Sequence, residues 1–265
     1  MAIPVRQRLF ALVTGAVVCS FLCAPLSATT LLALIDRKHH RVVLAADSLL
    51  RFSTSRPPEQ TCKIVAQPQC VFGMAGLFEK QYPVFRLRDL AEQACSVPQD
   101  LHQRADAFLE VAQRPVIEVA RYLRDNEPEF YRGLTSTHGG ELVMVLFAGT
   151  DRGNLVIYAR GYKLDSNGAV VPVSTDILEN TGGIGFFAGA NLAIADYMKT
   201  HKKWPKMDAV AAAKKFVEVE EQAHPEWVGP PVSIVTVNKL DEQKWIEPGE
   251  CSAASAKTPS SAVNH

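Results

Sequence analysis

The stretch TTLLALIDRKHHRVVLAADS, residues 29–48, decides the fold of this chain. Two short apolar runs, residues 31–35 and 41–46, lie on either side of the charged segment DRKHH. Apolar runs of this length that flank a polar turn are typical of a β-hairpin. A second hairpin is expected downstream, where residues 63–66 and 70–74 flank a polar Gln-Pro-Gln turn.

The rest of the chain alternates between blocks of strands and pairs of helices. Apolar residues at helical spacing predict four helices, over residues 82–94, 101–126, 190–201 and 207–223. Further strands are expected over residues 141–148, 155–162, 170–178, 232–237 and 244–246. This order favours packed sheets with helices outside them over alternating βαβ units. No internal repeat or linker divides the chain.

The first 28 residues have the pattern of an export signal. A short basic region precedes an apolar run over residues 9–22, and a small-residue cleavage site ends at Ala28. The apolar run is short for a membrane span. We therefore expect cleavage after Ala28, which would make Thr29 the first residue of the mature protein. An uncleaved signal anchor is the alternative.

Composition narrows the class of protein. Removing 28 of 265 residues leaves 237, enough for one large domain, which we expect over residues 29–250, with a disordered tail over 251–265. The leader carries two arginines and no acid, so the mature charge is 26 minus 28, or −2. A net charge near zero provides no basic surface that would attract nucleic acid.

Later apolar stretches are too short or interrupted to cross a membrane, so we expect a periplasmic or secreted protein.

An oxidising compartment permits disulfides, and the mature chain would keep four cysteines, for which three full pairings remain open. These are Cys62, Cys70, Cys95 and Cys251.

Four features follow one another in the order needed for a nucleophile supported by a charged pair. They are Thr29, an A-A-D motif that ends at Asp47, Lys63, and an Ala-Gly pair that ends at Gly76. This opening resembles that of proteasome β-subunits and the bacterial HslV-type protease, most strongly over residues 29–77. Those proteins are N-terminal-nucleophile hydrolases. The resemblance implies an α+β fold, a four-layer αββα sandwich, and peptidase activity.

The roles of these residues also follow from their chemistry. A free N-terminal threonine carries its own base, because the α-amine of Thr29 can take the proton of its hydroxyl. A lysine ammonium nearby lowers the pKa of that amine, which is the expected role of Lys63. Asp47 would hold the lysine charged and oriented. The N–H of Gly76 could stabilise an oxyanion.

The chain departs from the family pattern at two places. The family has a Ser-Gly-rich turn before its third helix, whereas residues 183–189 read GIGFFAG and contain no serine. An aspartate and a serine precede the last core strand in the family. Here Glu226 is the candidate for that aspartate, and Gly229 stands where the serine is expected.

These patterns predict an exported N-terminal threonine hydrolase that cleaves amide bonds, and peptide bonds in particular, through an acyl-enzyme. A small-molecule amidase on the same fold is one alternative, because a fold does not fix a substrate. A non-catalytic binding or assembly protein is the other, and the missing serines favour it. We expect a peptide or amide as substrate and a homo-oligomer as partner. The sequence has no metal-site motif and indicates no cofactor.

Overall fold

The computed structural model describes residues 29–50, 57–137 and 140–251. The expected signal peptide lies outside the described residues, and so does the expected tail beyond Cys251. Cys251 itself is buried and disulfide-bonded, so the fold extends to this residue. None of the helices in these described ranges is long and apolar enough to cross a membrane.

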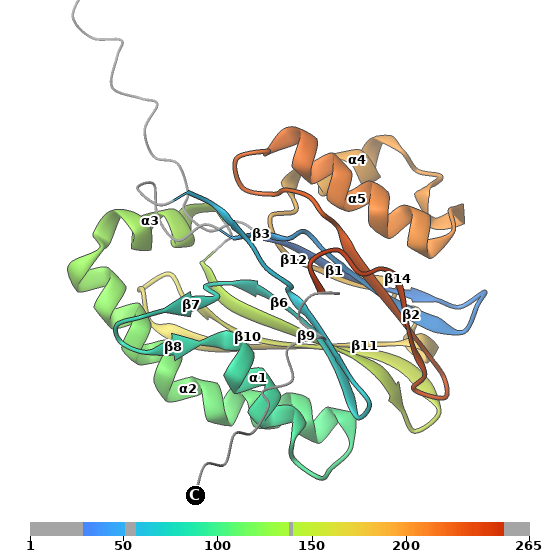
Figure 1. The fold of residues 1–265 in the computed structure, drawn as a ribbon, viewed down its shortest axis with the longest axis horizontal. Coiled ribbons are helices and arrows are strands. Elements are labelled where there is room, and N and C mark those ends of the chain that lie inside the picture. Colours follow the sequence, from blue (N-terminus) through green and yellow to red (C-terminus); the bar gives the residue numbers. More distant parts are fainter. Residues whose placement is uncertain (1–28, 51–56, 138–139, 252–265) are drawn as a thin grey trace, which may run out of the picture.

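Two five-stranded antiparallel sheets form the centre of the molecule (Figure 1). The first sheet has the order β12-β1-β2-β13-β14, with strands Gly185–Gly189, Thr30–Asp36, Arg41–Ala46, Ser233–Asn238 and Gln243–Glu247. The second has the order β11-β10-β9-β6-β5, with strands Val170–Leu178, Asn154–Leu164, Glu141–Asp151, Cys70–Gly76 and Ile64–Gln67. Two short ladders lie outside these sheets, β3 (Leu49–Leu50) with β4 (Glu59–Gln60) and β7 (Glu79–Lys80) with β8 (Phe85–Arg86).

Helices cover the outer face of each sheet. In Figure 1, α4 and α5 lie over the first sheet and α1 and α2 lie against the second. The α-helices are α1 (Leu87–Cys95), α2 (Leu101–Asn126), α3 (Pro128–Thr137), α4 (Leu192–Thr200) and α5 (Ala209–Ala223), with short 3-10 turns at Glu179–Thr181 and Trp204–Lys206. The chain therefore has the four αββα layers expected from its sequence.

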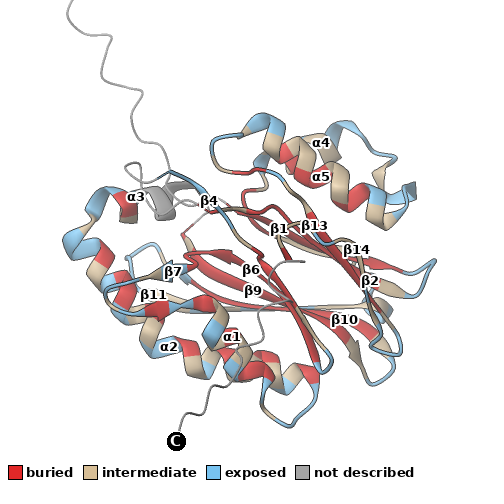
Figure 2. Cartoon of the chain, in the orientation of Figure 1, coloured by how far each residue is buried: buried red, intermediate tan, exposed pale blue. Residues whose placement is uncertain are grey.

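Three apolar layers hold these elements together, and Figure 2 shows the buried residues concentrated on the sheets. Side chains alternate between the two faces of a strand. In β1, Leu31 faces the second sheet, whereas Leu32 faces the helices and packs in a cluster with Phe216 of α5. On the other side of the molecule, Phe108 of α2 packs against Phe147 of β9. Because both faces of β1 are covered, all seven of its residues are buried, and residues 31–35 within it form a continuous apolar run.

The expected strands and all four expected helices are present, with differences at their ends. Helix α1 begins at Leu87 and not at Tyr82, because residues 85–86 pair with β7 and the residue before Pro83 avoids helical angles. The turn between β9 and β10 is shorter than expected. It consists of Arg152 and Gly153, both with positive φ, as a two-residue hairpin loop requires.

Of the longer elements, helix α3 and strand β12 were not expected from the sequence, and neither were the short ladders β3–β4 and β7–β8. We had interpreted the glycine-rich segment 183–189 as a turn, but residues 185–189 form an edge strand that pairs antiparallel with β1. The glycines permit close approach, since a Cβ on Gly185 would lie 2.4 Å from the Ala33 carbonyl oxygen. The strand places Gly189 opposite Thr30, at the end of the sheet where β1 begins.

Two disulfides select one of the three open pairings, Cys62 with Cys251 and Cys70 with Cys95. The first joins residues separated by 189 positions in the sequence and ties the end of the described chain to the residue before Lys63.

Candidate active site

The two threonines at the start of β1 have different surroundings. Thr29 lies just before the strand, and its carbonyl oxygen accepts the Ala190 N–H at 2.8 Å. The Thr30 side chain is fully buried, and its hydroxyl donates to the Ala190 carbonyl at 3.0 Å. The hydroxyl of Thr30 is thus engaged within the fold. Thr29 remains the candidate nucleophile.

Asp47 directly follows β2 and is completely buried. Its Oδ1 accepts the Thr30 backbone N–H at 2.9 Å. Its Oδ2 accepts the backbone N–H groups of Leu49, at 3.0 Å, and Gly229, at 3.3 Å. Burial disfavours the ionised carboxylate, and these donors offset that cost. The aspartate therefore fixes three backbone segments around one end of β1.

Lys63 directly precedes β5 and is also buried, so it reaches Asp47 from the opposite sheet. Its Nζ donates to Asp47 Oδ1 at 2.9 Å and to Oδ2 at 3.0 Å, and also to the Leu49 carbonyl. Burial lowers the pKa of Lys63 and raises that of Asp47, and the attraction between the two groups opposes both changes. The structure thus brings together the two charged residues that the sequence selected.

The pair lies one peptide unit from Thr29. Lys63 Nζ and the Thr30 backbone nitrogen each lie 2.9 Å from Asp47 Oδ1. The two nitrogens are therefore no more than about 6 Å apart, the range in which charges shift the pKa of a neighbouring group. Within the described part of the chain, no hydrogen bond joins Lys63 directly to Thr29.

Gly76 ends β6 in a conformation that only glycine adopts readily. Its φ is +89°, and a Cβ at this position would lie 2.3 Å from the Leu142 carbonyl oxygen. Two residues earlier on the strand, the Met74 N–H donates to the Lys63 carbonyl. Because alternate N–H groups of a strand point to the same edge, the Gly76 N–H points to the edge at which Lys63 lies.

Glu226 lies away from this group of residues. It is exposed, and its carboxylate lies 3.8 Å from His224, whose ring stacks on Trp227. Gly229, three residues later, meets the site through its backbone, since its carbonyl also accepts the Ser48 N–H at 3.1 Å. The segment 226–229 therefore meets the site through the backbone N–H and carbonyl of Gly229, and not through the carboxylate of Glu226.

The structure adds one carboxylate that sequence reasoning missed. Glu141, the first residue of β9, accepts the Gly189 N–H at 3.0 Å. The residue is half-buried, but its carboxylate is enclosed by protein, and this burial raises its pKa to about 7. In sequence, a glutamate at the start of an apolar strand resembles any solvated strand end, so no signal distinguished it.

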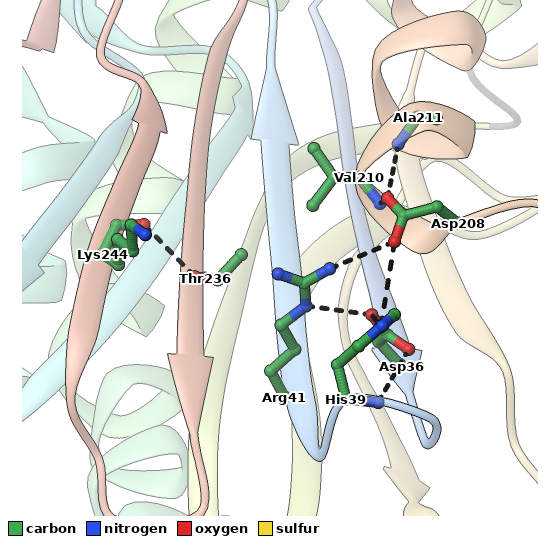
Figure 3. A network of polar contacts seen from close by, with 8 residues as sticks. All are labelled: Asp36, His39, Arg41, Asp208, Val210, Ala211, Thr236 and Lys244. Carbon is green, nitrogen blue, oxygen red and sulfur yellow. Dashed lines mark hydrogen bonds and ion pairs between the residues drawn. The ribbon is translucent and has the colours of Figure 1, made fainter.

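One group of side chains in the described ranges has the spacing to bind a metal ion, and it lies far along β1 from Thr29. Asp36, His39 and Asp208 meet at the tip of the first hairpin (Figure 3). Arg41 already supplies a cation there, donating to Asp36 at 2.9 Å and to Asp208 at 3.3 Å. Asp208 also caps the N-terminus of α5. The cluster therefore has a structural role, in which the guanidinium joins the hairpin to the helix.

Two antiparallel sheets between two helical layers form a four-layer αββα sandwich, the type of fold that N-terminal-nucleophile hydrolases have. No family model matches the sequence, and no curated protein is similar to it. Among solved structures, the chain is similar to Anbu, the ancestral β-subunit, from Yersinia bercovieri, with 12% identity, a TM-score of 0.49, and coverage of 82% of this chain and 87% of that one. An Anbu (Gly-1) mutant from Hyphomicrobium sp. strain MC1 has the same identity and TM-score, with coverage of 83% and 87%.

These comparisons correct the resemblance drawn from the sequence, which named proteasome β-subunits and the HslV-type protease. The similar structures are Anbu proteins, which are proteasome-like but form a distinct family. The residues behind the resemblance occupy two hairpins, and such a short set describes a type of fold without distinguishing the families that share it.

Proposed function

We propose that this chain is an exported hydrolase in which Thr29 is the nucleophile that cleaves amide bonds, with peptides as the preferred class of substrate. One observation carries the proposal. A single buried carboxylate, that of Asp47, binds both the Lys63 ammonium and the backbone N–H that follows Thr29. A buried ion pair is costly to maintain, and its position behind a candidate nucleophile favours a chemical role.

The proposed reaction begins when cleavage after Ala28 frees the α-amine of Thr29. The amine takes the hydroxyl proton, and the oxygen attacks the substrate carbonyl carbon. The Gly76 N–H stabilises the oxyanion. The carbon–nitrogen bond then breaks, the leaving amine takes the proton, and an ester remains on Thr29. Water adds to the ester, gives a proton to the α-amine, and releases the acid as the threonine hydroxyl is restored.

The charged pair would tune the base. The Lys63 ammonium disfavours a second positive charge nearby, so it lowers the pKa of the Thr29 amine toward neutral pH. Asp47 keeps the lysine charged and in place. The two disulfides favour the exported location, because such bonds persist in oxidising compartments.

The test determines which residue begins the mature protein and whether that protein hydrolyses amide bonds. Intact mass and N-terminal sequencing of the exported protein should give Thr29 as the first residue. That material should hydrolyse members of a peptide library, and Thr29→Ala should not. Activity confined to small acyl amides would assign the amidase alternative. A mature start at another residue, or full activity in folded Thr29→Ala, would overturn the proposal. The expected homo-oligomer is checked by light scattering on the same material.

A further inference from the structure

Two polar contacts between the sheets flank Thr29. On one side, Lys63 from the second sheet reaches Asp47 at the end of β2. On the other, Glu141 from the second sheet reaches Gly189 at the end of β12. The first contact belongs to the function proposed above, whereas that function does not use the second.

The segment that Glu141 holds touches Thr29 directly. A Cβ on Gly189 would lie 1.8 Å from the Thr29 carbonyl oxygen and 3.5 Å from the Cβ of Ala75. The next residue, Ala190, donates its N–H to that same carbonyl. Gly189 thus lies between the candidate nucleophile and the strand that ends at Gly76, and its position determines the position of Thr29.

Glu141 is poorly compensated for a buried acid. Within the described ranges its carboxylate accepts one hydrogen bond, whereas an ionised carboxylate can accept about four. No charged side chain shifts its pKa, which burial raises against the effect of the Gly189 N–H. The ionisable side chains on β10, the neighbouring strand, are Tyr158, Arg160, Tyr162 and Lys163, of which Lys163 lies opposite Glu141 in the ladder. Those on α3 are Glu129, Tyr131 and Arg132, and the Asp47–Lys63 pair lies beyond Thr30.

We propose that Glu141 is a positioning residue of the Thr29 site, whose ionised carboxylate holds the Gly189–Ala190 segment against the nucleophile. The inference rests on the function proposed above. The ionised carboxylate makes a charge-assisted hydrogen bond to the Gly189 N–H, and protonation weakens that bond. Its titration near pH 7 therefore adds a second ionisation, besides that of the Thr29 amine, to the acid side of the activity profile.

The experiment compares wild type with Glu141→Gln in mature protein that begins at Thr29. Glutamine keeps the size and the acceptor but removes the charge. Amide hydrogen exchange at pH 8, followed by NMR, should show weaker protection of Gly189 and Ala190 in the variant. The kcat/KM at pH 8 should fall about tenfold, the effect of one lost charge-assisted contact. On a logarithmic plot, the acid limb of the wild type should be steeper near pH 7 than that of the variant, because protonation of Glu141 adds a step of about tenfold.

Glu179→Gln is the matched control, because Glu179 also accepts a backbone N–H, that of Leu155 at 3.3 Å, and lies outside the site. It should leave the acid limb and the exchange of Gly189 unchanged. Unchanged protection of Gly189 in Glu141→Gln would overturn the inference, as would an unchanged slope in an active enzyme. If Gly189 loses protection but neither wild type nor variant hydrolyses amides, the proposed function fails and the positioning contact stands.

Discussion

Lys63 and Asp47 join the two sheets of the sandwich through a buried ion pair, with Nζ–O distances of 2.9 and 3.0 Å. Neither residue lies within a strand of the two sheets. Asp47 follows β2 and Lys63 precedes β5. The pair therefore forms at the end of the sandwich where β2 ends and β5 begins. This placement gives the pair two expected effects, one on stability and one on the reactivity of Thr29.

Removing the lysine should destabilise the protein strongly. Lys63→Met leaves Asp47 buried without its cation, which typically costs about 3–5 kcal/mol. The double variant Lys63→Met/Asp47→Asn should recover part of this loss, because no unpaired charge remains. Urea unfolding of the wild type, Lys63→Met, Asp47→Asn and the double variant measures the coupling. Strictly additive losses would contradict a direct ion pair.

The same substitution should change the pH dependence of hydrolysis. Loss of a positive charge near the Thr29 amine raises the pKa of that amine, so the acid limb of kcat/KM should move toward higher pH. Asp47→Asn should impair the same step, and the double variant should be little slower than either single one. The measurement is a pH–rate profile, and a limb that stays in place would exclude electrostatic tuning by Lys63.

Adjacent threonines provide a matched pair of variants. Thr29→Ala should reduce turnover by on the order of 10³-fold or more while the fold remains intact. Thr30→Ala removes a buried hydroxyl that bonds to Ala190, so it should cost about 1 kcal/mol of stability yet retain hydrolysis. Turnover and thermal unfolding distinguish the two, and the reverse pattern would transfer the nucleophile to Thr30.

Stability should also depend on pH through Glu141. Its pKa rises from 4.5 to about 7 on folding, so the folded state binds a proton more tightly than the unfolded state. Stability from this group is complete below pH 4.5 and is lost as pH rises through 7, by roughly 3 kcal/mol at most. Glu141→Gln should therefore raise the thermal midpoint at pH 8 and change it little at pH 4. A lower midpoint at pH 8 would show a stabilising structural role.

The two disulfides should differ in their effect on the site. Opening the loop closed by Cys62–Cys251 should cost about 5 kcal/mol in the chain-entropy account, and opening Cys70–Cys95 about 3.5 kcal/mol. Because Cys62 adjoins Lys63, serine substitution of the first pair should also slow hydrolysis. Substitution of the second pair should mainly lower stability. Equal loss of turnover in the two double variants, measured where both are folded, would contradict this.

The sequence predicted the elements whose apolar runs and polar turns are local, such as the hairpin from Thr30 to Ala46. It also selected Asp47 and Lys63, because they follow Thr29 in the order of a motif that the chain shares with the family it resembles, a cue that Glu141 lacks. The distances that join them across the sheets are tertiary and could not be read from spacing. Strand β12 was missed because its glycines are typical of a turn, and only pairing with β1 makes it a strand.

The site residues that were missed act through backbone groups or through distant contacts. Gly229 takes part with its N–H, whereas the sequence reasoning looked for side chains, a serine at Gly229 and an aspartate at Glu226. Glu141 precedes Gly189 by 48 positions, and nothing in either local sequence indicates that they meet. Contacts between strands of different sheets have no periodic signal in a single sequence.

If the chain is exported as proposed above, the Cys62–Cys251 bond also bears on the order of events during export. A chain that crosses the membrane with its N-terminus first delivers Cys62 early, whereas Cys251 arrives only after nearly the whole domain has been translocated. Cys62, the residue beside Lys63, therefore cannot form its disulfide with Cys251 until synthesis and transport are almost complete. Under the proposed export, the site would then be completed only at the end of translocation. Hydrolysis would therefore begin only after the protein has left the compartment in which it was made.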